Sequence, residues 1–272
     1  MTDIHGQHDD PADDPHATAV AAATRAGVTV RALDPLPDPT DAGAVAALCA
    51  RVWRVPFEQS PAEPSTLIAY AHAGGYVGVA EREGRVVGTA VGFLGRDEPA
   101  VPAAGPYLHS HIAAVDADAA GGGVGLALKL HQRAWCLDRG MDRIEWTFDP
   151  LIARNAHVNL TRLGAVGVAY LTDFYGPLTD GINVGTPSDR LLVRWPLGVW
   201  PPRPGTPPES TAADDLLAVV PRDAETLWRT DPDAALAARL ALRATLGRWL
   251  AAGSVIAGFD RSVPAYYREE PS

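Results

Sequence analysis

The sequence contains little cysteine, almost no lysine and no long apolar run, and each shortage narrows what the protein can be. The two cysteines, Cys49 and Cys136, stand far apart and match no metal-binding spacing. Lys129 is the only lysine, so arginine supplies every other strong base. No stretch approaches the ~20 apolar residues of a membrane span, and the N-terminus lacks the basic-then-apolar pattern of an export signal. We therefore expect a reduced, cytoplasmic protein with no metal site and no membrane contact.

The charge balance is acidic. Lys and Arg total 23 against 33 Asp and Glu, which gives a formal net charge of −10. Nucleic-acid binding needs a basic surface that neutralises phosphates, so we expect no nucleic-acid partner. Hydrophobic residues make up 47% of the chain and charged residues 21%, as in an ordinary globular protein. A chain of 272 residues can form one large α/β domain or two small ones.

The two ends of the chain differ in composition from its centre. Residues 1–26 begin with an acidic stretch that has almost no large apolar side chain, so we predict a disordered acidic tail. We expect a main domain over residues 27–196. Residues 197–212 are rich in proline and are expected to form a linker or surface arm. Residues 213–272 carry a strand–helix–strand pattern, which predicts a β-α-β extension packed on the main domain.

Apolar periodicity predicts an alternation of strands and helices within the main domain. The expected order is β-α-α-β-β-β-α-β-α-β-β, which is typical of the α/β class. Helices are expected over 40–55, 65–73, 123–139 and 153–164. Strands are expected over 28–33, 76–81, 85–94, 107–115, 143–148, 166–176 and 189–195.

A glycine-rich loop precedes the helix expected at 123–139. It contains Gly121, Gly122, Gly123 and Gly125. Backbone N–H groups in the first turn of a helix lack partners, and glycine lets them approach a phosphate closely. The loop does not fit the dinucleotide-binding fingerprint, and the chain has no nucleoside-triphosphate loop. It is either an anion site or a plain flexible connection, and we favour the anion site.

The stretch 120–125 resembles the pyrophosphate loop of the GNAT acyltransferase superfamily, Gln/Arg-x-x-Gly-x-Gly/Ala, with Gly123 and Gly125 in matching places. Asn155, Ala156 and Gly164 fit the helix that follows in that family. The resemblance spans residues 28–195 and implies an α/β fold of the GNAT type, with a mixed, mostly antiparallel sheet splayed at the acyl-CoA site. Three further motifs resemble a branch that includes amino-acid N-succinyltransferases: "LHSH", "IEWTFDPLIARN" and "TDGINVGTPSDR".

The resemblance implies acyl-CoA as co-substrate, either acetyl-CoA or succinyl-CoA. It places the acyl carbonyl against the backbone of the strand before the loop and the pyrophosphate in the loop itself. Two departures stand out. Ala120 and Gly122 replace basic residues of the family, and the tyrosine that often protonates the leaving thiolate falls on Leu160. The residues expected to bind the co-substrate are Ala113, Ala114, Val115, Gly121, Gly122, Gly123, Val124, Gly125, Leu126 and Asn155.

The implied reaction is attack of an amine on a thioester, which needs a base, a donor to the carbonyl oxygen and an acid. His109 and His111 stand two apart on one strand and so point to one face, where either could act as the base or both could simply pack. Glu145 could hold the substrate ammonium or form a strand-edge salt bridge. Tyr175 is a candidate for the acid.

A polar insertion ends in Asp189 and Arg190, which we expect to bind substrate; the alternative is a surface salt bridge. The sequence thus predicts a CoA-dependent N-acyltransferase that moves an acetyl or succinyl group to the amine of a small molecule such as an amino acid. Two alternatives stay open. One is acetylation of a protein or antibiotic amine, and the other is an acyl-CoA-binding module without turnover. A monomer or a homodimer would fit.

Overall fold

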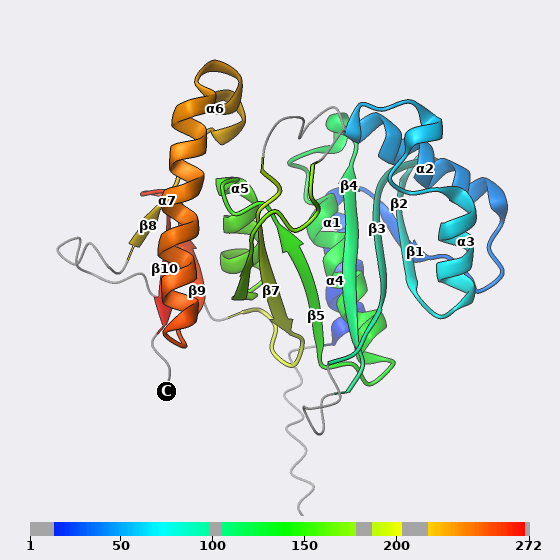
Figure 1. The fold of residues 1–272 in the computed structure, drawn as a ribbon. Coiled ribbons are helices and arrows are strands. Elements are labelled where there is room, and N and C mark those ends of the chain that lie inside the picture. The colour runs from blue at the N-terminus through cyan, green and yellow to red at the C-terminus, as the bar shows by residue number, and fades with distance from the viewer. Residues whose placement is uncertain (1–13, 98–104, 178–186, 203–216, 270–272) are drawn as a thin grey trace, which may run out of the picture.

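One sheet of ten strands runs through the structure in the order β1-β2-β3-β4-β5-β7-β6-β9-β10-β8 (Figure 1). The computed structural model describes residues 14–97, 105–177, 187–202 and 217–269. The paired strands are antiparallel except for β4 and β5, so the predicted mixed, mostly antiparallel sheet is confirmed. The strands are β1 (Thr29–Ala32), β2 (Tyr76–Arg82), β3 (Arg85–Gly95), β4 (Tyr107–Val115), β5 (Arg143–Phe148), β6 (Val166–Leu171), β7 (Arg190–Pro196), β8 (Leu217–Val219), β9 (Val255–Asp260) and β10 (Ala265–Glu269).

Helices cover both faces of the sheet (Figure 1). Four of them begin with proline behind an acidic N-cap whose carboxylate accepts from the first-turn N–H groups, which fixes where these helices start. The helices are α1 (Pro15–Ala26), α2 (Pro39–Trp53), α3 (Pro64–His72), α4 (Val124–Leu137), α5 (Ala153–Ala156, continued by a π-helical segment His157–Arg162), α6 (Ala224–Thr230) and α7 (Pro232–Ala251).

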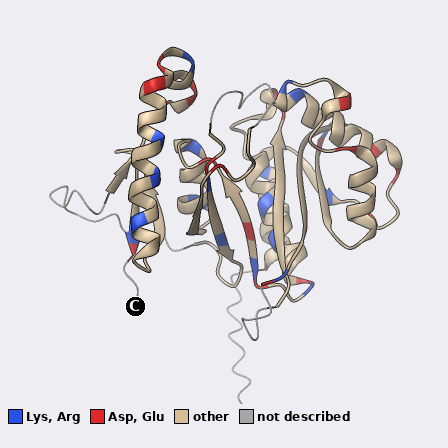
Figure 2. Ribbon diagram, viewed as in Figure 1, with Lys and Arg blue, Asp and Glu red and all other residues tan. Residues whose placement is uncertain are grey.

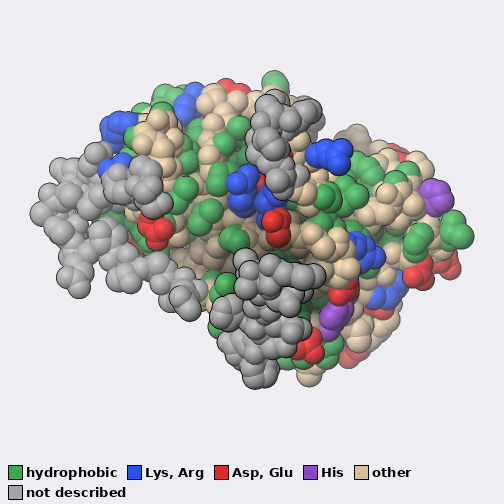
Figure 3. Space-filling model, turned by 90° about the horizontal axis from the view of Figure 1, so that it is seen from below, with side chains coloured by type: hydrophobic (Ala, Val, Ile, Leu, Met, Phe, Trp, Pro, Cys, Tyr) green, Lys and Arg blue, Asp and Glu red, His purple; other side chains and the backbone are tan. Residues whose placement is uncertain are grey.

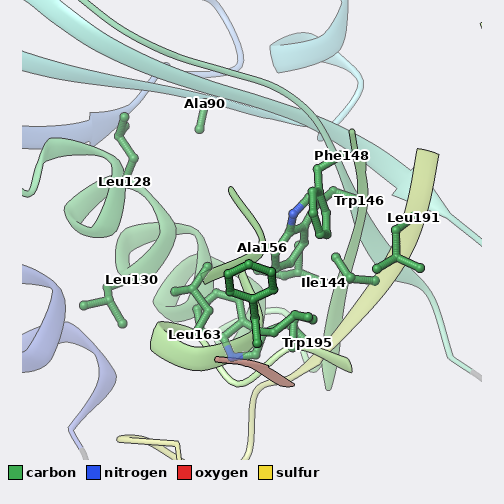
Figure 4. Close-up of a cluster of buried hydrophobic side chains, with 14 of the residues drawn as sticks. Ala90, Leu128, Leu130, Ile144, Trp146, Phe148, Ala156, Leu163, Leu191 and Trp195 are labelled. Atoms are coloured by element: carbon green, nitrogen blue, oxygen red, sulfur yellow. The ribbon is translucent and has the colours of Figure 1, made fainter. Parts of the chain in front are cut away.

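The core consists of two apolar clusters, one on each face of the sheet. The larger lies under α1, α4 and α5 and includes Leu128, Trp146 and Trp195 (Figure 4). The smaller lies under α2 and α3 and includes Leu48 and Leu67. The strands between them therefore have buried side chains on both faces, and β2 and β3 read as near-continuous apolar runs.

β4 and β5 separate soon after they begin. Only Leu108 and His109 pair with β5, opposite Ile144 and Glu145. Beyond these pairs the strands diverge, and β5 continues along β7. The backbone of β4 from Ser110 onward is thus unpaired on its β5 side, which opens a V-shaped gap in the sheet, as the resemblance implied.

A β-bulge in β4 lies at the start of this gap. The register with β3 skips His111, which is the extra residue of the bulge. Side-chain alternation changes face there. Leu108 and Ser110 face α4, whereas Ile112 and Ala114 belong to the cluster under α2 and α3. The bulge thereby presents His111 outside both clusters.

Residues 15–26 form helix α1, so the prediction of disorder over 1–26 is wrong for this part; residues 1–13 lie outside the described residues. The four buried alanines of α1 pack against α4 and join the larger cluster. The composition argument looked for large apolar side chains. Two helices can instead approach closely where the facing residues are alanines. The many close van der Waals contacts between them then stabilise the packing without large apolar side chains. The buried alanines are Ala19, Ala22, Ala23 and Ala26.

The C-terminal region extends the main sheet, so the expected β-α-β unit packed on the domain needs correction. Its first and last expected strands, β8 and β9, and its long helix, α7, are present. A second helix, α6, and a third strand, β10, were missed, so the order is β-α-α-β-β. β9 joins the sheet by pairing with β6 at Ile256 and Gly167. Of the expected linker, residues 203–212 lie outside the described residues.

Two arginines on one face of α7 attach this extension to the sheet. Arg239 is fully buried and donates two hydrogen bonds to Asp149, of 3.0 and 2.8 Å. One turn later Arg243 donates two to Asp189, of 2.9 and 2.8 Å. Figure 2 shows basic positions spaced along α7. Asp149 also accepts from the Leu151 N–H at 2.9 Å, so it ends β5 as a turn residue and not as a free carboxylate.

The described surface carries mixed charge. On the face in Figure 3, acidic and basic side chains are interspersed with apolar ones.

In the described ranges, no helix is both long and apolar enough to cross a bilayer. No cluster of three histidine, cysteine, aspartate or glutamate side chains in these ranges is arranged to hold a metal ion. Cys49 and Cys136 are both buried and unbridged.

Candidate functional site

The glycine-rich loop forms an uncapped helix N-terminus. Gly121 and Gly123 have φ values of 78° and 91°, a left-handed conformation that glycine adopts without strain. Gly123 is the N-cap of α4, and no side chain caps the helix there. A Cβ on Gly121 would meet nothing within 4 Å, and one on Gly125 would meet only Val115 at 3.9 Å. The first-turn N–H groups of α4 therefore face an open approach, which suits an anion.

The strand that leads into this loop supplies free backbone groups. Ala113, Ala114 and Val115 lie on the part of β4 that no longer pairs with β5. Ala113 is exposed and Val115 is half-buried. The loop and this strand segment thus form one continuous backbone surface along the gap.

His109 and His111 lie side by side, as their spacing predicted. Their ring centroids are 6.2 Å apart, and both rings contact Phe93, at 5.1 and 5.8 Å. Burial lowers the pKa of both histidines below the usual value; the neighbouring His111 lowers that of His109 further, and Glu145 opposes the shift. Both imidazoles are therefore neutral at pH 7, the state in which a histidine can accept a proton.

Tyr175 and Arg190 reach the same place from the other side of the gap. The Tyr175 ring lies 6.4 Å from the His111 ring, and its hydroxyl is 3.1 Å from the Thr147 hydroxyl on β5. The Arg190 guanidinium stacks on the Tyr175 ring at 5.1 Å. Its Nη1 donates to the Asp189 carbonyl oxygen at 2.8 Å, and it has no carboxylate partner in the described part of the chain. Residues from β4, the turn after β6 and the start of β7 thus converge.

Two predicted site residues are engaged elsewhere. Glu145 is buried and accepts from Arg143 at 3.1 Å and from Arg194 at 2.8 Å, which is the salt-bridge alternative. Asp189 is fully buried, and its carboxylate binds Arg243. Neither carboxylate is open to a substrate. Their role in the structure is to hold β5, β7 and α7 in place.

The helix after β5 carries two further residues considered in the sequence analysis. Asn155 is half-buried in α5, and its side chain forms no hydrogen bond with another described residue. Leu160 is buried in the larger apolar cluster, so it cannot donate a proton. One further residue was not predicted as part of the site: Lys129 of α4 is buried beside Ser110 and Trp146, at the point where β4 and β5 part.

One family of known proteins matches part of the sequence. The sequence model of the Acetyltransferase (GNAT) family matches residues 45–164. Residues 45–164, less than half of the chain, are thus similar to this family and are called the GNAT domain below. The GNAT domain therefore contains β2 to β5, α4, the glycine-rich loop and the whole helical segment that ends at Arg162.

Several solved structures overlap with this GNAT domain in part. An N-acetyltransferase from Staphylococcus aureus Mu50 has a TM-score of 0.49 and 17% identity, over 62% of this chain and 98% of its own. The ribosomal-protein-S18-alanine N-acetyltransferase of Escherichia coli has values of 0.48 and 19%, over 63% and 95%. The structure of yncA from Salmonella typhimurium with its cofactor acetyl-CoA has values of 0.47 and 16%, over 67% and 99%. A search of the curated proteins gave no match.

Proposed function

We propose that the protein transfers an acyl group, acetyl or succinyl, from its CoA thioester to the amine of a small molecule that carries a carboxylate, such as an amino acid. The observation that carries this proposal is the convergence of His111, Tyr175 and Arg190 across the gap between β4 and β5. A neutral base and a guanidinium without a carboxylate partner among the described residues stand together where the backbones of β4 and β5 separate.

In this proposal, each group of residues has its own role in binding or catalysis. Gly121 to Gly125 and the first turn of α4 hold the pyrophosphate through backbone N–H groups. The unpaired backbone of Ala113 to Val115 holds the pantetheine arm and the acyl carbonyl. His111 takes the proton of the attacking amine, and the His109 ring packs beside it.

Arg190 binds the carboxylate of the acceptor, or that of a dicarboxylic acyl group. A carboxylate that enters a partly dry pocket loses water and needs a fixed cation in exchange. Arginine offers a planar fork for two parallel hydrogen bonds, and the Tyr175 ring under it restricts its motion. Since the carboxylate of Asp189 is taken by Arg243, the charge of Arg190 is not neutralised by its neighbour.

Steady-state thiol release tests the proposal. Acetyl-CoA and succinyl-CoA are each offered with amino acids, their amides and the matching amines that lack a carboxylate. We expect turnover with the amino acids, and we expect Arg190→Lys to raise KM about tenfold for them, since about 1.4 kcal/mol is a factor of ten. The amides should not respond to the substitution. Acyl-CoA binding without thiol release towards any amine would make the protein a binding module, and turnover confined to peptide N-termini would make it a protein acetyltransferase.

A further inference from the structure

The single lysine of the chain lies buried under the point where the two strands separate. Lys129 of α4 is 8% exposed. Its Nζ donates to Ser110 Oγ on β4 at 2.8 Å and lies 3.9 Å from the centre of the Trp146 ring on β5. Trp146 sits within the core between the sheet and the helices (Figure 4). The ammonium group therefore touches one residue from each arm of the gap.

This ammonium group has too few partners for its burial. It carries three N–H donors, and Ser110 Oγ is the one hydrogen-bond acceptor recorded for it among the described residues. Ser110 in turn donates to Gln132 Oε1 at 3.1 Å, and Gln132 Nε2 is itself buried without a partner. No described carboxylate forms an ion pair with Lys129. Buried donors without a described acceptor thus lie on the α4 face of the sheet, at Lys129 and Gln132.

The ammonium group of Lys129 therefore loses its proton more easily than that of an exposed lysine. Burial lowers its pKa to about 7. The titratable groups that interact with it are Cys136 on its own helix and His109 on β4. Burial raises the pKa of the Cys136 thiol to about 12, and burial keeps His109 neutral at pH 7, so neither group compensates the ammonium. On β5, Glu145 is tied to Arg143 and Arg194 on the other face of the sheet.

Lys129 and the histidines stand on opposite faces of the same opening. The last pair between β4 and β5 is His109 with Glu145, and the next residues, Ser110 and Trp146, are the two that contact Lys129. The glycine-rich loop starts the same helix that carries Lys129. In the acyl transfer proposed above, a co-substrate with its pyrophosphate in this loop would reach the gap along the α4 face. The amine then approaches from the face of His111.

We propose that Lys129 is the acid that protonates the CoA thiolate as it leaves. This proposal rests on the acyl transfer proposed above. The amine nitrogen attacks the thioester carbon and loses a proton to His111, which then releases that proton to solvent. The C–S bond of the tetrahedral intermediate breaks, and the sulfur takes a proton from Lys129 Nζ, which becomes neutral and regains a proton from solvent. The products are the amide and the CoA thiol, and no charge is gained or lost overall.

Two observations support this role. The position where the resemblance implies a tyrosine acid holds Leu160, which has no proton to give. A free thiol has a pKa near 8.5, so an ammonium group with a pKa near 7 is the stronger acid and can pass its proton to the thiolate at neutral pH. Tyr175 binds Thr147 on the face of the histidines, so it lines the acceptor side of the gap.

Because Lys129 is the only lysine, its proton can be observed directly. Protein grown with lysine labelled with carbon-13 at Cε gives a single lysine resonance in its NMR spectrum. We expect this resonance to titrate near pH 7 and to shift when CoA is added, without any turnover. Titration at the ordinary lysine pKa, or a resonance that ignores saturating CoA, would overturn the proposal, and either result leaves the acyl transfer itself untouched.

Kinetics of two variants complete the test. Lys129→Met removes the proton donor, and Gln132→Leu disturbs the same buried network while keeping the lysine. We expect Lys129→Met to lower kcat about 10² or more, to leave the Kd for CoA unchanged and to abolish the fall of kcat above pH 7. Gln132→Leu should keep that alkaline limb. Equal losses in both variants would show a packing role for Lys129. A wild type without thiol release would instead refute the acyl transfer.

Discussion

Arg243 of α7 donates two hydrogen bonds, of 2.9 and 2.8 Å, to the carboxylate of Asp189 at the start of β7. Asp189 is fully buried. The same carboxylate accepts from the Tyr170 hydroxyl at 2.7 Å and from the Asp173 N–H at 3.1 Å. Asp189 therefore ties the C-terminal helix to the turn that carries Tyr175. The extension supports one wall of the proposed acceptor site.

Replacement of Arg243 should affect both stability and substrate binding. Arg243→Gln leaves a buried carboxylate without its cation, so we expect the free energy of unfolding to fall by roughly 3 kcal/mol and KM for the acceptor to rise. Denaturant melts and thiol-release kinetics measure the two effects. Arg154→Gln is the control, because the Arg154–Glu225 pair is exposed and should contribute under ~1 kcal/mol. A variant of Arg243 as stable as the control would contradict this account.

The Asp189 carboxyl group also predicts an acid dependence. Burial acts to raise its pKa, but the hydrogen bonds from Arg243, Tyr170 and the Asp173 N–H outweigh burial and lower the pKa. Because the folded pKa lies below the unfolded value of about 3.8, the stabilisation is present above that value and disappears as pH falls below it. Arg243→Gln should therefore lose less stability than the wild type on acidification below pH ~4, which melts over an acid series would show.

Lys129 predicts a rise of stability with pH in the alkaline range. Its pKa is about 7 in the folded protein and near 10.5 when unfolded. Between these values the unfolded chain binds the extra proton, so the free energy of unfolding should rise with pH, at a limiting slope of about 1.4 kcal/mol per unit. Melts from pH 7 to pH 10 should show this rise in the wild type and a smaller one in Lys129→Met. Parallel curves for the two proteins would mean that Lys129 stays charged when folded.

The sequence predicted the loop and the histidine pair but missed Lys129, Arg239 and Arg243. The glycines were recognisable because the left-handed φ of Gly121 and Gly123 is a local requirement. The histidines share a face because strand alternation is local too. The arginines of α7 stand one turn apart, which is visible in the sequence, but their acidic partners come from distant strand ends. Tertiary pairing of that kind leaves no mark on local periodicity.

Local sequence patterns also failed to predict one helix that packs through small residues and one short strand. Helix α1 has no large apolar stripe, since it packs through alanine, and composition alone suggested disorder. Strand β10 has three buried residues in succession, Ala265 to Tyr267, so it lacks the alternation of a half-buried strand. Both elements exist because a partner surface is present, α4 for one and β8 with β9 for the other.

The contribution of α1 can be measured by truncation. A chain that starts at Gly27 loses the alanine contacts with α4, so we expect its melting temperature to fall by several degrees, since about 1 kcal/mol shifts it by 2–4 °C in a chain of this size. A chain that starts at residue 14 keeps α1 and its Asp14 cap and serves as the control. Equal melting temperatures for the two truncations would show that α1 contributes nothing to the fold.

The phosphate-binding role of the loop can be tested at Gly125. This residue has an ordinary helical φ, and a Cβ there has room, so Gly125→Ala should stabilise α4 by up to about 1 kcal/mol. A longer side chain, as in Gly125→Leu, should cover the first-turn N–H groups and weaken CoA binding tenfold or more, without loss of stability. Gly43→Ala in α2 is the matched control, with the same gain in helix propensity and no effect on CoA. Calorimetric titration with CoA separates these outcomes. An unchanged affinity of Gly125→Leu for CoA would show that the loop does not bind the pyrophosphate.

The acid limb of the pH profile should identify the base. Burial lowers the pKa of both His109 and His111, so kcat/KM should rise with pH and level off at or below about 6.5 as the base loses its proton. His111 lies at the bulge, 6.4 Å from the Tyr175 ring, so His111→Gln should lower turnover about 10²–10⁴-fold and remove this limb. His109→Gln should have a smaller effect on the rate and should shift the limb, because the two rings interact. His72→Gln is the control, since that exposed histidine at the end of α3 contacts only the Pro35 carbonyl oxygen. If the limb survives in both His109→Gln and His111→Gln, the histidines pack and the amine loses its proton to another group.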